Sequence, residues 1–284
     1  MENALEQLLY NLNIEKGSNG TFFKIKRMDE LKNLIQKGFV IQLSKVLYNG
    51  WFIKTHGPVH MSRLTTYRDA KRKYKDKDIP EGTGFATMRL SLCDHSGTHL
   101  DGLNHVSERG ELFGKIKIEE VEEDIEGFNT LDITSIPPII TRGILFYTPK
   151  DRVEEVTVND LKNALGNIKV EKGDAAIIYT GWKDYTDEEP GIGLEGAKWL
   201  AEMGFRLVGN DSPRSEYITR GTKDFFPVHR FLIAQNGILL IDNMYLDDLV
   251  DSLQEEKRKD FLLIVIPLRL RGATASPVNP IAII

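Results

Sequence analysis

From residue 142 to the end of the chain, apolar runs typical of buried strands alternate with segments of helical periodicity. Thr157, with Asp160 three residues later, has the pattern that marks the first turn of a helix. Alternating strands and helices predict an α/β domain in which helices cover a sheet. No internal repeat or Ser/Gly-rich linker divides the chain, so we expect a single compact domain. The strand-like runs cover 142–148, 174–180, 205–208, 238–241 and 261–266, and the helical segments cover 157–165, 194–203 and 226–234.

The first 80 residues are expected to form an N-terminal extension that packs on a core of residues 81–284. Leucines at positions 5, 8, 9 and 12 have helical spacing, which predicts a short amphipathic helix that docks on the body or on a partner subunit. The run RDAKRKYKDKDI, residues 68–79, is strongly charged. We interpret it as a solvated helix face or loop, with a phosphate- or nucleic-acid-binding patch as the alternative that its aspartates disfavour.

Composition restricts the class of protein. The chain has 284 residues, with 37 Lys or Arg against 42 Asp or Glu, so no positive excess is available to bind nucleic acid. Its single cysteine, Cys93, allows no intrachain disulfide and no thiolate-rich zinc site. The longest apolar run, 261–267, is too short to cross a bilayer, and the first residues do not form a signal peptide. We expect a cytoplasmic protein with a small-molecule substrate and no nucleic-acid or membrane partner.

Three of the six histidines fall in one short segment, HSGTHLDGLNH, residues 95–105. On a helix, His95 and His99 share a face but Asp101 lies elsewhere. On an extended segment His95, His99, Asp101 and His105 have the same parity and project to one side. Gly97 fits the extended arrangement, because it allows a special dihedral between the two histidines.

Two imidazoles and one carboxylate form a plausible site for zinc, manganese or iron. Three protein ligands leave coordination positions open for water, which is typical of a catalytic site. The alternative is that these histidines form hydrogen bonds within a turn and bind nothing. A second candidate set is His229 with Asp242, which a turn at Gly237 can bring together. For His229 the alternative is a structural histidine within a helix.

Other motifs are weaker. Gly191, Gly193 and Gly196 match the GxGxxG pattern of dinucleotide-binding loops. The nearest strand-like run ends near Thr180, however, and acidic residues directly precede the glycines, so we interpret them as the loop that begins a helix. Cys93 is interpreted as a buried structural thiol beside Asp94. The remaining candidates are expected to be ordinary loop or core residues, with a role in lining a pocket as the alternative: His56, His60, Trp51, Phe85 and Phe113.

The segment HSGTHLDGLNH resembles the signature HxGTHxDxPxH of the cyclase family of metal-dependent hydrolases, which includes bacterial kynurenine formamidases and isatin hydrolases. The resemblance covers most of residues 85–284. It departs from the family pattern at Leu103, where the family has proline, and at Asp242, which is at or near the position of the family's glutamate. The further matching blocks are YTGWKDY (179–185), PGIGLEGAKWLAEMGFRLVGNDSP (190–213), FPVHRFLIAQNGILLIDNMYLDDL (226–249) and GATASPVNPIAI (272–283).

The resemblance implies a swivelling β/β/α fold with a mixed sheet, in dimers or tetramers. It implies His95, His99 and Asp101 as metal ligands and His105 as the acid/base residue. In members with two metals, Asp101 bridges the ions, and His229 and Asp242 would hold the second one. The shorter side chain of Asp242 leaves a single-metal site as the alternative, and the metal is expected to be zinc or manganese.

We therefore expect a metal-dependent hydrolase that cleaves an amide or cyclic amide similar to N-formylkynurenine or isatin. Three alternatives stay open. The same metal site can serve a lactone-forming or dehydrating cyclase. The chain can be a metal-binding protein without catalysis, such as a sensor or scaffold. A nicotinamide-dependent oxidoreductase is the remaining alternative, and it depends on the glycine pattern alone.

Overall fold

The computed structural model describes residues 1–17, 23–121, 123–124, 127–183 and 188–284. The last two residues of the block 179–185 lie outside the described part, as does the acidic residue Asp187 before the glycine pattern. No helix in the described ranges is long and apolar enough to cross a membrane.

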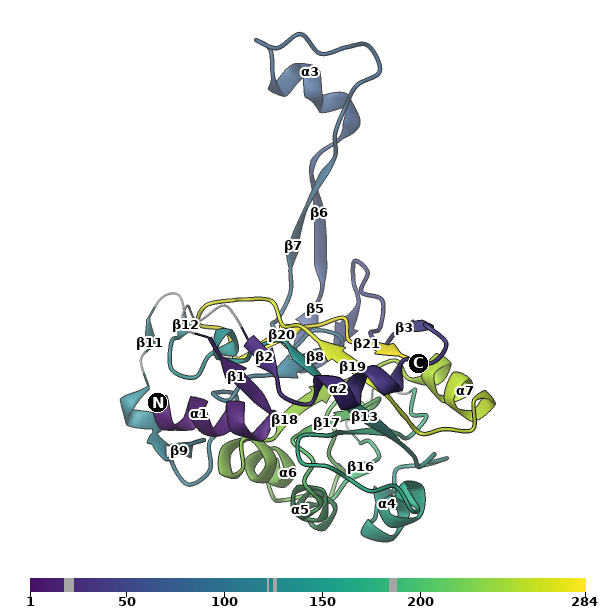
Figure 1. Ribbon diagram of the computed structural model, residues 1–284. Helices are drawn as coiled ribbons and strands as arrows, with labels where there is room; N and C mark the ends of the chain where they lie inside the picture. The colour runs from purple at the N-terminus through teal and green to yellow at the C-terminus, as the bar shows by residue number, and fades with distance from the viewer. Residues whose placement is uncertain (18–22, 122, 125–126, 184–187) are drawn as a thin grey trace.

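A mixed nine-stranded sheet forms the centre of the described structure (Figure 1). Its four middle strands are parallel to one another, and the strands on both sides of this group are antiparallel. In sheet order the strands are β20 (Ala275–Pro277), β8 (His99–Asp101), β18 (Leu239–Asp242), β17 (Leu207–Asn210), β15 (Ala175–Tyr179), β13 (Ile139–Tyr147), β19 (Asp260–Val265), β21 (Ile281–Ile283) and β3 (Val40–Gln42).

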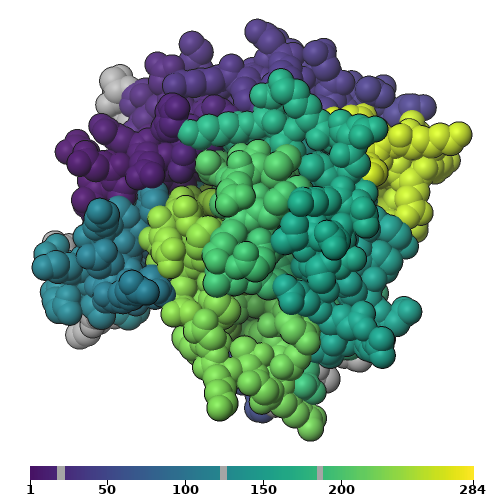
Figure 2. Space-filling model, turned by 90° about the horizontal axis from the view of Figure 1, so that it is seen from below, coloured from purple at the N-terminus to yellow at the C-terminus, as the bar shows by residue number. Residues whose placement is uncertain are grey.

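The parallel strands are mostly apolar because both of their faces are covered. Every residue of β17 and β18 is buried. Helices α4 (Val158–Leu165), α5 (Leu194–Met203) and α6 (Pro227–His229), which continues as η5 (Arg230–Gln235), lie below the sheet in Figure 1. Figure 2 looks onto this face and shows it covered by the teal and green part of the chain, with the purple N-terminal part along one edge. Helix α7 (Asp247–Glu255) lies at the flank.

The predicted α/β alternation is confirmed. Each strand-like run coincides with one of the strands β13, β15, β17, β18 and β19, and each helical segment coincides with α4, α5 or the pair α6 and η5. Thr157 caps α4 as predicted, because its hydroxyl accepts a hydrogen bond from the Asp160 backbone while the Asp160 carboxylate accepts one from Thr157.

The amphipathic N-terminal helix is also confirmed. Helix α1 (Glu2–Asn11) buries Leu8, and Leu12 directly after it is also buried, in the core that the main sheet shares. It leads to the hairpin of β1 (Ile14–Lys16) and β2 (Phe23–Ile25), and then to α2 (Met28–Leu31) and η1 (Lys32–Leu34). This part of the chain therefore packs on the body.

Residues 60–91, which we call the arm, project away from the body (Figure 1). The arm is a hairpin of β6 (His60–Thr65) and β7 (Thr87–Ser91), with η2 (Tyr67–Asp69) and α3 (Ala70–Lys73) at its tip. The expected boundary between residues 80 and 81 falls inside this hairpin, and the domain division itself stays a prediction. Most of the charged run 68–79 is exposed at the tip, as the solvated interpretation requires.

Short elements complete the described structure. They lie in the loops that connect the sheet strands and in the segment before the arm. They are β4 (Phe52–Ile53), β5 (Gly57–Pro58), β9 (Glu111–Leu112), β10 (Ile116–Lys117), η3 (Ile118–Glu120), β11 (Glu123–Asp124), β12 (Gly127–Phe128), η4 (Ile133–Ser135), β14 (Glu155–Val156) and β16 (Gly191–Ile192).

Candidate metal centre

The clustered histidines lie where β8 pairs with β18 at one side of the sheet. His99 is opposite Asp242 in the antiparallel register, so residues far apart in sequence meet at this edge. The β8 backbone is extended over three residues, which directs His99 and Asp101 to the same face. Gly97 has φ +70°, a conformation that favours glycine, and the resulting turn returns His95 to the other two. The one-sided extended segment predicted for 95–105 is therefore correct only for His99–Asp101.

The first candidate ligand set contains His95, His99 and Asp101, all of them buried. Nδ1 of His95 lies 3.1 Å from Oδ1 of Asp101, and Nε2 of His99 lies 3.6 Å from the same oxygen. Two ligands of one zinc ion are roughly 3 to 3.5 Å apart when each is about 2 Å from the metal. The distances from His95 and His99 to Asp101 are thus close to this spacing, while the group whose possible ligand atoms all lie within 4.8 Å of one another is His95, Asp101 and His105.

Hydrogen bonds determine which ring nitrogen of His95 and of His99 faces Asp101. The Thr274 hydroxyl donates to Oδ2 of Asp94, at 3.0 Å, so it accepts from Nε2–H of His95, also at 3.0 Å. Nδ1 of His99 lies 2.9 Å from the carbonyl oxygen of Gly97, which can only accept. Nδ1 of His95 and Nε2 of His99 are therefore the ring nitrogens that face Asp101. A hydrogen-bond acceptor on the other ring nitrogen is typical of histidines that bind metals.

The second candidate set contains Asp101, His229 and Asp242. Nε2 of His229 lies 3.7 Å from Oδ2 of Asp101 and 3.6 Å from Oδ2 of Asp242. Nδ1–H of His229 donates to Oε1 of Glu216 at 3.0 Å, so Nε2 is the ring nitrogen that faces the two aspartates. The Ser215 hydroxyl donates to Oδ1 of Asp242 and leaves Oδ2 toward His229. The structure thus brings Asp242 next to His229, as the turn at Gly237 predicts.

Asp101 lies between the two sets, and its surroundings indicate whether a cation fits there. It is 1% exposed, and neither of its oxygens accepts a hydrogen bond from a described residue. Burial alone raises the pKa of such a carboxyl, but His105, His95 and His99 outweigh burial and hold the pKa of Asp101 below its usual range. An ionised, buried carboxylate without donors is very unfavourable unless a cation compensates it. Its two oxygens face different imidazole sets, so the donor arrangement fits one ion on each side.

The histidines differ in their electrostatic surroundings. Burial lowers the pKa of His95 and His229, but Asp101 outweighs burial at His95, and Asp242 and Glu216 outweigh it at His229, so both values are raised. The pKa of His105 is lowered to about 4, chiefly by burial; Asp101 raises it in part, and the neighbouring imidazoles also lower it. His105 is therefore a neutral base near pH 7.

His105 follows a turn after β8 and is partly buried beside the first set. Its ring centroid is 4.2 Å from that of His95 and 6.1 Å from that of His229. One possible ligand atom from each of His95, Asp101 and His105 lies within 4.8 Å of the other two. His105 thus faces the space between the two sets.

His56 is the residue that sequence reasoning underestimated. It lies in the loop before the arm, and its ring centroid is 5.6 Å from that of His95 and 6.0 Å from that of His99. Its Nδ1 is buried and accepts or donates no hydrogen bond within the described residues. Burial lowers its pKa to about 4. Thr274 and Glu216 were also missed, because no spacing rule connects a distant hydroxyl or carboxylate with a particular histidine.

The other sequence candidates lie away from the centre. His60 is exposed on the arm, Phe85 stacks against Tyr74 at the arm tip, and Phe113 is buried in the main core. Trp51 packs in a small separate cluster with Ile53 and Val59.

Three further sequence features have structural explanations. Leu103, which replaces the family's proline, is fully buried in the core. Cys93 is only partly buried, which corrects the expected buried thiol; burial raises the pKa of the thiol most, and Asp94 also raises it. The glycine pattern begins a helix as predicted, because Gly193 is the N-cap of α5.

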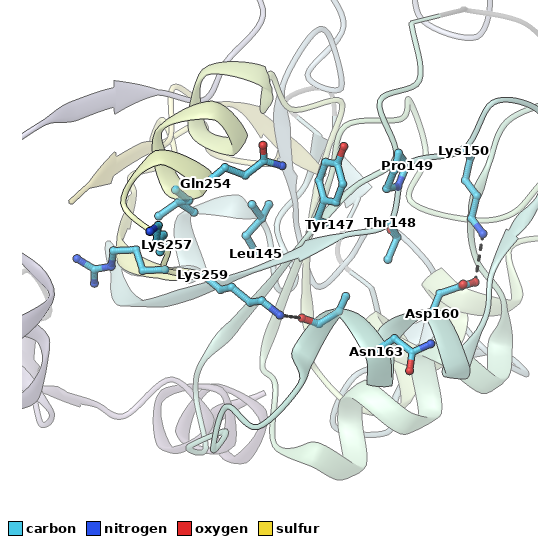
Figure 3. Close-up of a pocket in the computed structure, with 13 residues that line it drawn as sticks. Leu145, Tyr147, Thr148, Pro149, Lys150, Asp160, Asn163, Gln254, Lys257 and Lys259 are labelled. Atoms are coloured by element: carbon cyan, nitrogen blue, oxygen red, sulfur yellow. Dashed lines mark hydrogen bonds and ion pairs between the residues drawn. The ribbon is translucent and has the colours of Figure 1, made fainter.

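A cavity of about 650 Å³ lies elsewhere on the molecule, between α4, α7 and the end of β13 (Figure 3). Tyr147, Lys150 and Lys259 point into this region, where Lys150 pairs with Asp160 at 3.1 Å. None of its lining residues belongs to the candidate metal centre.

Comparison with known proteins shows relatives in sequence and in fold. The kynurenine formamidase of Bordetella avium is 26% identical over 192 residues, which are 68% of this chain and 78% of that protein. The crystal structure of a novel cyclase superposes with a TM-score of 0.81 at 23% identity, covering 92% of this chain and 93% of the other. Isatin hydrolase A from Labrenzia aggregata superposes with a TM-score of 0.62 at 16% identity, covering 88% and 94%. The Cyclase family model matches residues 41–217, which is more than half of the chain, and the chain belongs to this family.

Proposed function

We propose that this chain is a metal-dependent hydrolase of carbon–nitrogen bonds other than peptide bonds. The single observation that carries the proposal is Asp101, a buried carboxylate whose oxygens accept no hydrogen bond from the described residues and face imidazole nitrogens on two sides. Such a constellation needs a cation and leaves coordination positions open. The names of the relatives, kynurenine formamidase and isatin hydrolase, supply the reaction class by similarity.

A divalent ion bound here would lower the pKa of a water ligand and polarise a substrate carbonyl. We assign the first ion to His95, His99 and Asp101, and a second ion to Asp101, His229 and Asp242. Asp242 is shorter than the family's glutamate, but its Oδ2 lies 3.6 Å from Nε2 of His229, which supports retention of the second site. Zinc and manganese both suit this nitrogen and oxygen donor set.

His105 is the proposed general base and acid. It is neutral near pH 7, because burial lowers its pKa to about 4, and it lies beside the first ligand set. In the forward reaction it accepts the proton of the attacking water. It then returns that proton to the leaving nitrogen as the carbon–nitrogen bond breaks, so the side chain is regenerated.

The proposed substrates are amides or cyclic amides of the N-formylkynurenine or isatin type. The test combines metal content, measured by elemental mass spectrometry, with hydrolysis of both compounds by the wild type, His99→Ala and His60→Ala. The expected result is one or two equivalents of zinc or manganese in the wild type and in His60→Ala, with loss of metal and hydrolysis in His99→Ala. Full metal content in His99→Ala would contradict the ligand assignment, and a metal-loaded wild type without hydrolysis would contradict the reaction class.

The cyclase alternative uses the same residues in a dehydrating direction. Hydrolysis must place one solvent oxygen in the product, whereas a dehydrating cyclisation releases water. Reaction in ¹⁸O-labelled water, with product mass measured, therefore separates the two. Incorporation of one label is expected for the proposed hydrolase.

A further inference from the structure

The cavity between α4, α7 and the end of β13 has the size and walls of a small-molecule site (Figure 3). Its volume of about 650 Å³ lies within the usual range of ligand pockets, roughly 300 to 1,000 Å³. Leu145 of β13, Ala164 of α4 and Leu253 of α7 form an apolar wall. An apolar part of a ligand would leave water when it enters this cavity, which favours binding.

Tyr147 adds an aromatic ring to the lining. It is 48% exposed, and its ring stacks on that of Tyr179 in β15, with an interplanar angle of 7° and a centroid distance of 5.5 Å. The Tyr179 hydroxyl donates to Asp247 at 2.9 Å, which holds the pair in place. The plane of Tyr147 is therefore fixed while much of the side chain stays accessible, and a flat aromatic ligand can pack against it.

The described lining residues carry a net positive charge. Asp160 is the one carboxylate among them. The basic residues are Lys150, Lys257, Arg258 and Lys259. Lys150 pairs with Asp160 at 3.1 Å, and Arg258 pairs at 3.2 Å with Asp260, which lies outside the lining. Two positive charges, those of Lys257 and Lys259, therefore have no carboxylate partner within the described part of the chain.

The ends of two helices reduce this charge. The last turns of α4 and α7 both lie at the cavity, and the Lys259 ammonium donates to the carbonyl oxygen of Ala164 in the last turn of α4. The C-terminus of a helix carries about −0.5 elementary charge. Two such ends offset about one of the two positive charges, so about one remains. This remainder matches a ligand with a single negative charge better than a phosphate ester with two.

Lys257 has a backbone conformation in which a lysine is disfavoured. It has φ +52° just after α7, where the N–H groups of Lys257 and Arg258 donate to the carbonyls of Gln254 and Leu253, at 3.2 and 3.0 Å. Glycine is the usual residue at this position of a helix end. The helix dipole favours a cation near this end, but Arg258 and Lys259 already supply that charge. A ligand that binds its ammonium group in the cavity explains why Lys257 occupies the position.

We propose that this cavity binds a planar aromatic carboxylate. The ring of the ligand packs between Tyr147 and the apolar wall, and its carboxylate accepts hydrogen bonds from the ammonium groups of Lys257 and Lys259. The cavity shares no residue with the candidate metal centre. The inference therefore does not depend on the proposed reaction.

The test is calorimetric titration of the full-length protein, as purified, with 2-naphthoate at low and at high salt. One saturable site whose affinity falls as salt is added is expected. His99→Ala should keep this site, because His99 is remote from the cavity. Loss of all binding in His99→Ala would place the ligand at the metal centre and overturn the proposal.

Two related compounds test the chemistry of the ligand. 2-Naphthylmethanol has the same ring system without the charge, and cyclohexanecarboxylate has the charge without an aromatic plane. Both should bind at least about threefold more weakly than 2-naphthoate, because each lacks one of the two contacts. Equal affinity for 2-naphthylmethanol would refute the anion site, and equal affinity for cyclohexanecarboxylate would refute the aromatic one.

Two pairs of variants locate the site. Lys257→Gly removes the ammonium group and suits the backbone, so the variant should fold, and it should bind 2-naphthoate about tenfold more weakly. Its matched control is Lys115→Gly, the same change at an exposed lysine with φ +61° elsewhere, which should bind like the wild type. Tyr147→Leu should weaken binding about threefold, whereas Tyr67→Leu on the arm should not.

The variants also state what would overturn the proposal. Lys257→Gly that binds as tightly as Lys115→Gly would show that the Lys257 ammonium does not contact the ligand. No saturable binding of 2-naphthoate by the wild type at millimolar concentration would show that the cavity is not a site for this class. Circular dichroism checks that each variant is folded.

Discussion

Loss of the Thr274 hydroxyl should weaken metal binding although Thr274 is not a proposed ligand. The hydroxyl accepts the Nε2–H of His95 and donates to Asp94, each at 3.0 Å, and it thereby keeps Nδ1 of His95 directed at Asp101. In Thr274→Val the shape is retained but the acceptor is lost. A buried imidazole N–H without an acceptor then opposes the tautomer that the metal needs.

The expected loss of metal affinity follows from the position of the Thr274 hydroxyl next to a proposed ligand. Loss of an outer partner of a metal-bound histidine costs about 10- to 100-fold in affinity, or roughly 1.4 to 2.7 kcal/mol. Thr274→Ser keeps the hydroxyl and is expected to stay within about twofold of the wild type on the same basis. The difference in metal affinity between Thr274→Val and Thr274→Ser therefore measures the effect of the hydrogen bond.

The assay is a competition titration of the metal-free protein against a chromophoric chelator, with zinc and with manganese. Both variants also need the same far-ultraviolet circular dichroism spectrum as the wild type. If Thr274→Val and Thr274→Ser bind metal equally well, the assignment of Nδ1 of His95 as the metal-facing atom is wrong.

Three further outcomes are expected. His105→Gln should lower kcat by about 10²- to 10⁴-fold with full metal content, because the general base is lost but the ligands are not; a rate equal to the wild type would remove His105 from the mechanism. His56→Gln should lower kcat/KM about tenfold with metal retained, which is the effect of one lost hydrogen bond to substrate. His60→Gln, on the exposed arm, should have no effect. Equal rates in both variants would show that His56 does not contact substrate. Burial raises the pKa of Glu189 from 4.5 to about 7, against the opposing effect of Arg214. The folded state then holds a proton that the unfolded state has released between these pH values, so the unfolding free energy falls as pH rises through this window, by at most about 3 kcal/mol. The free energy of unfolding, measured with urea at pH 5 and at pH 7.5, should differ less between the two pH values for Glu189→Gln than for the wild type or Glu188→Gln. An unchanged difference would refute the assignment to Glu189.

Much of the sheet was predictable from the sequence because its strands and helices have local signatures. The parallel strands are rich in apolar residues, and Thr157 with Asp160 forms a local hydrogen-bonded cap. The grouping of His95, His99 and Asp101 was predictable for the same reason, since the three residues are close in sequence. The joining of this group to Asp242 depends on the register of β8 with β18, which no local pattern specifies.

The residues that sequence reasoning missed or underestimated are also far from the histidine segment in sequence. His56 is 39 positions before His95, and Thr274 is 179 positions after it. Each reaches the centre through the path of a loop, and loop paths depend on packing rather than periodicity. The arm was also not predicted, because its two strands are exposed on both faces and show no regular alternation of apolar and polar residues.

The arm also affects how sequences of this type can change over time. Its two strands meet at the register of His60 with Ser91, so the chain leaves and returns to the body at one point. Lengthening a segment whose ends are already paired adds little to the entropy of closing it, about 0.6 kcal/mol for each doubling. Insertions and deletions between residues 60 and 91 should therefore be tolerated without altering β8 or the residues of the metal centre. Related proteins that share this sheet can therefore differ in arm length, and so in what the arm contacts, with little loss of stability.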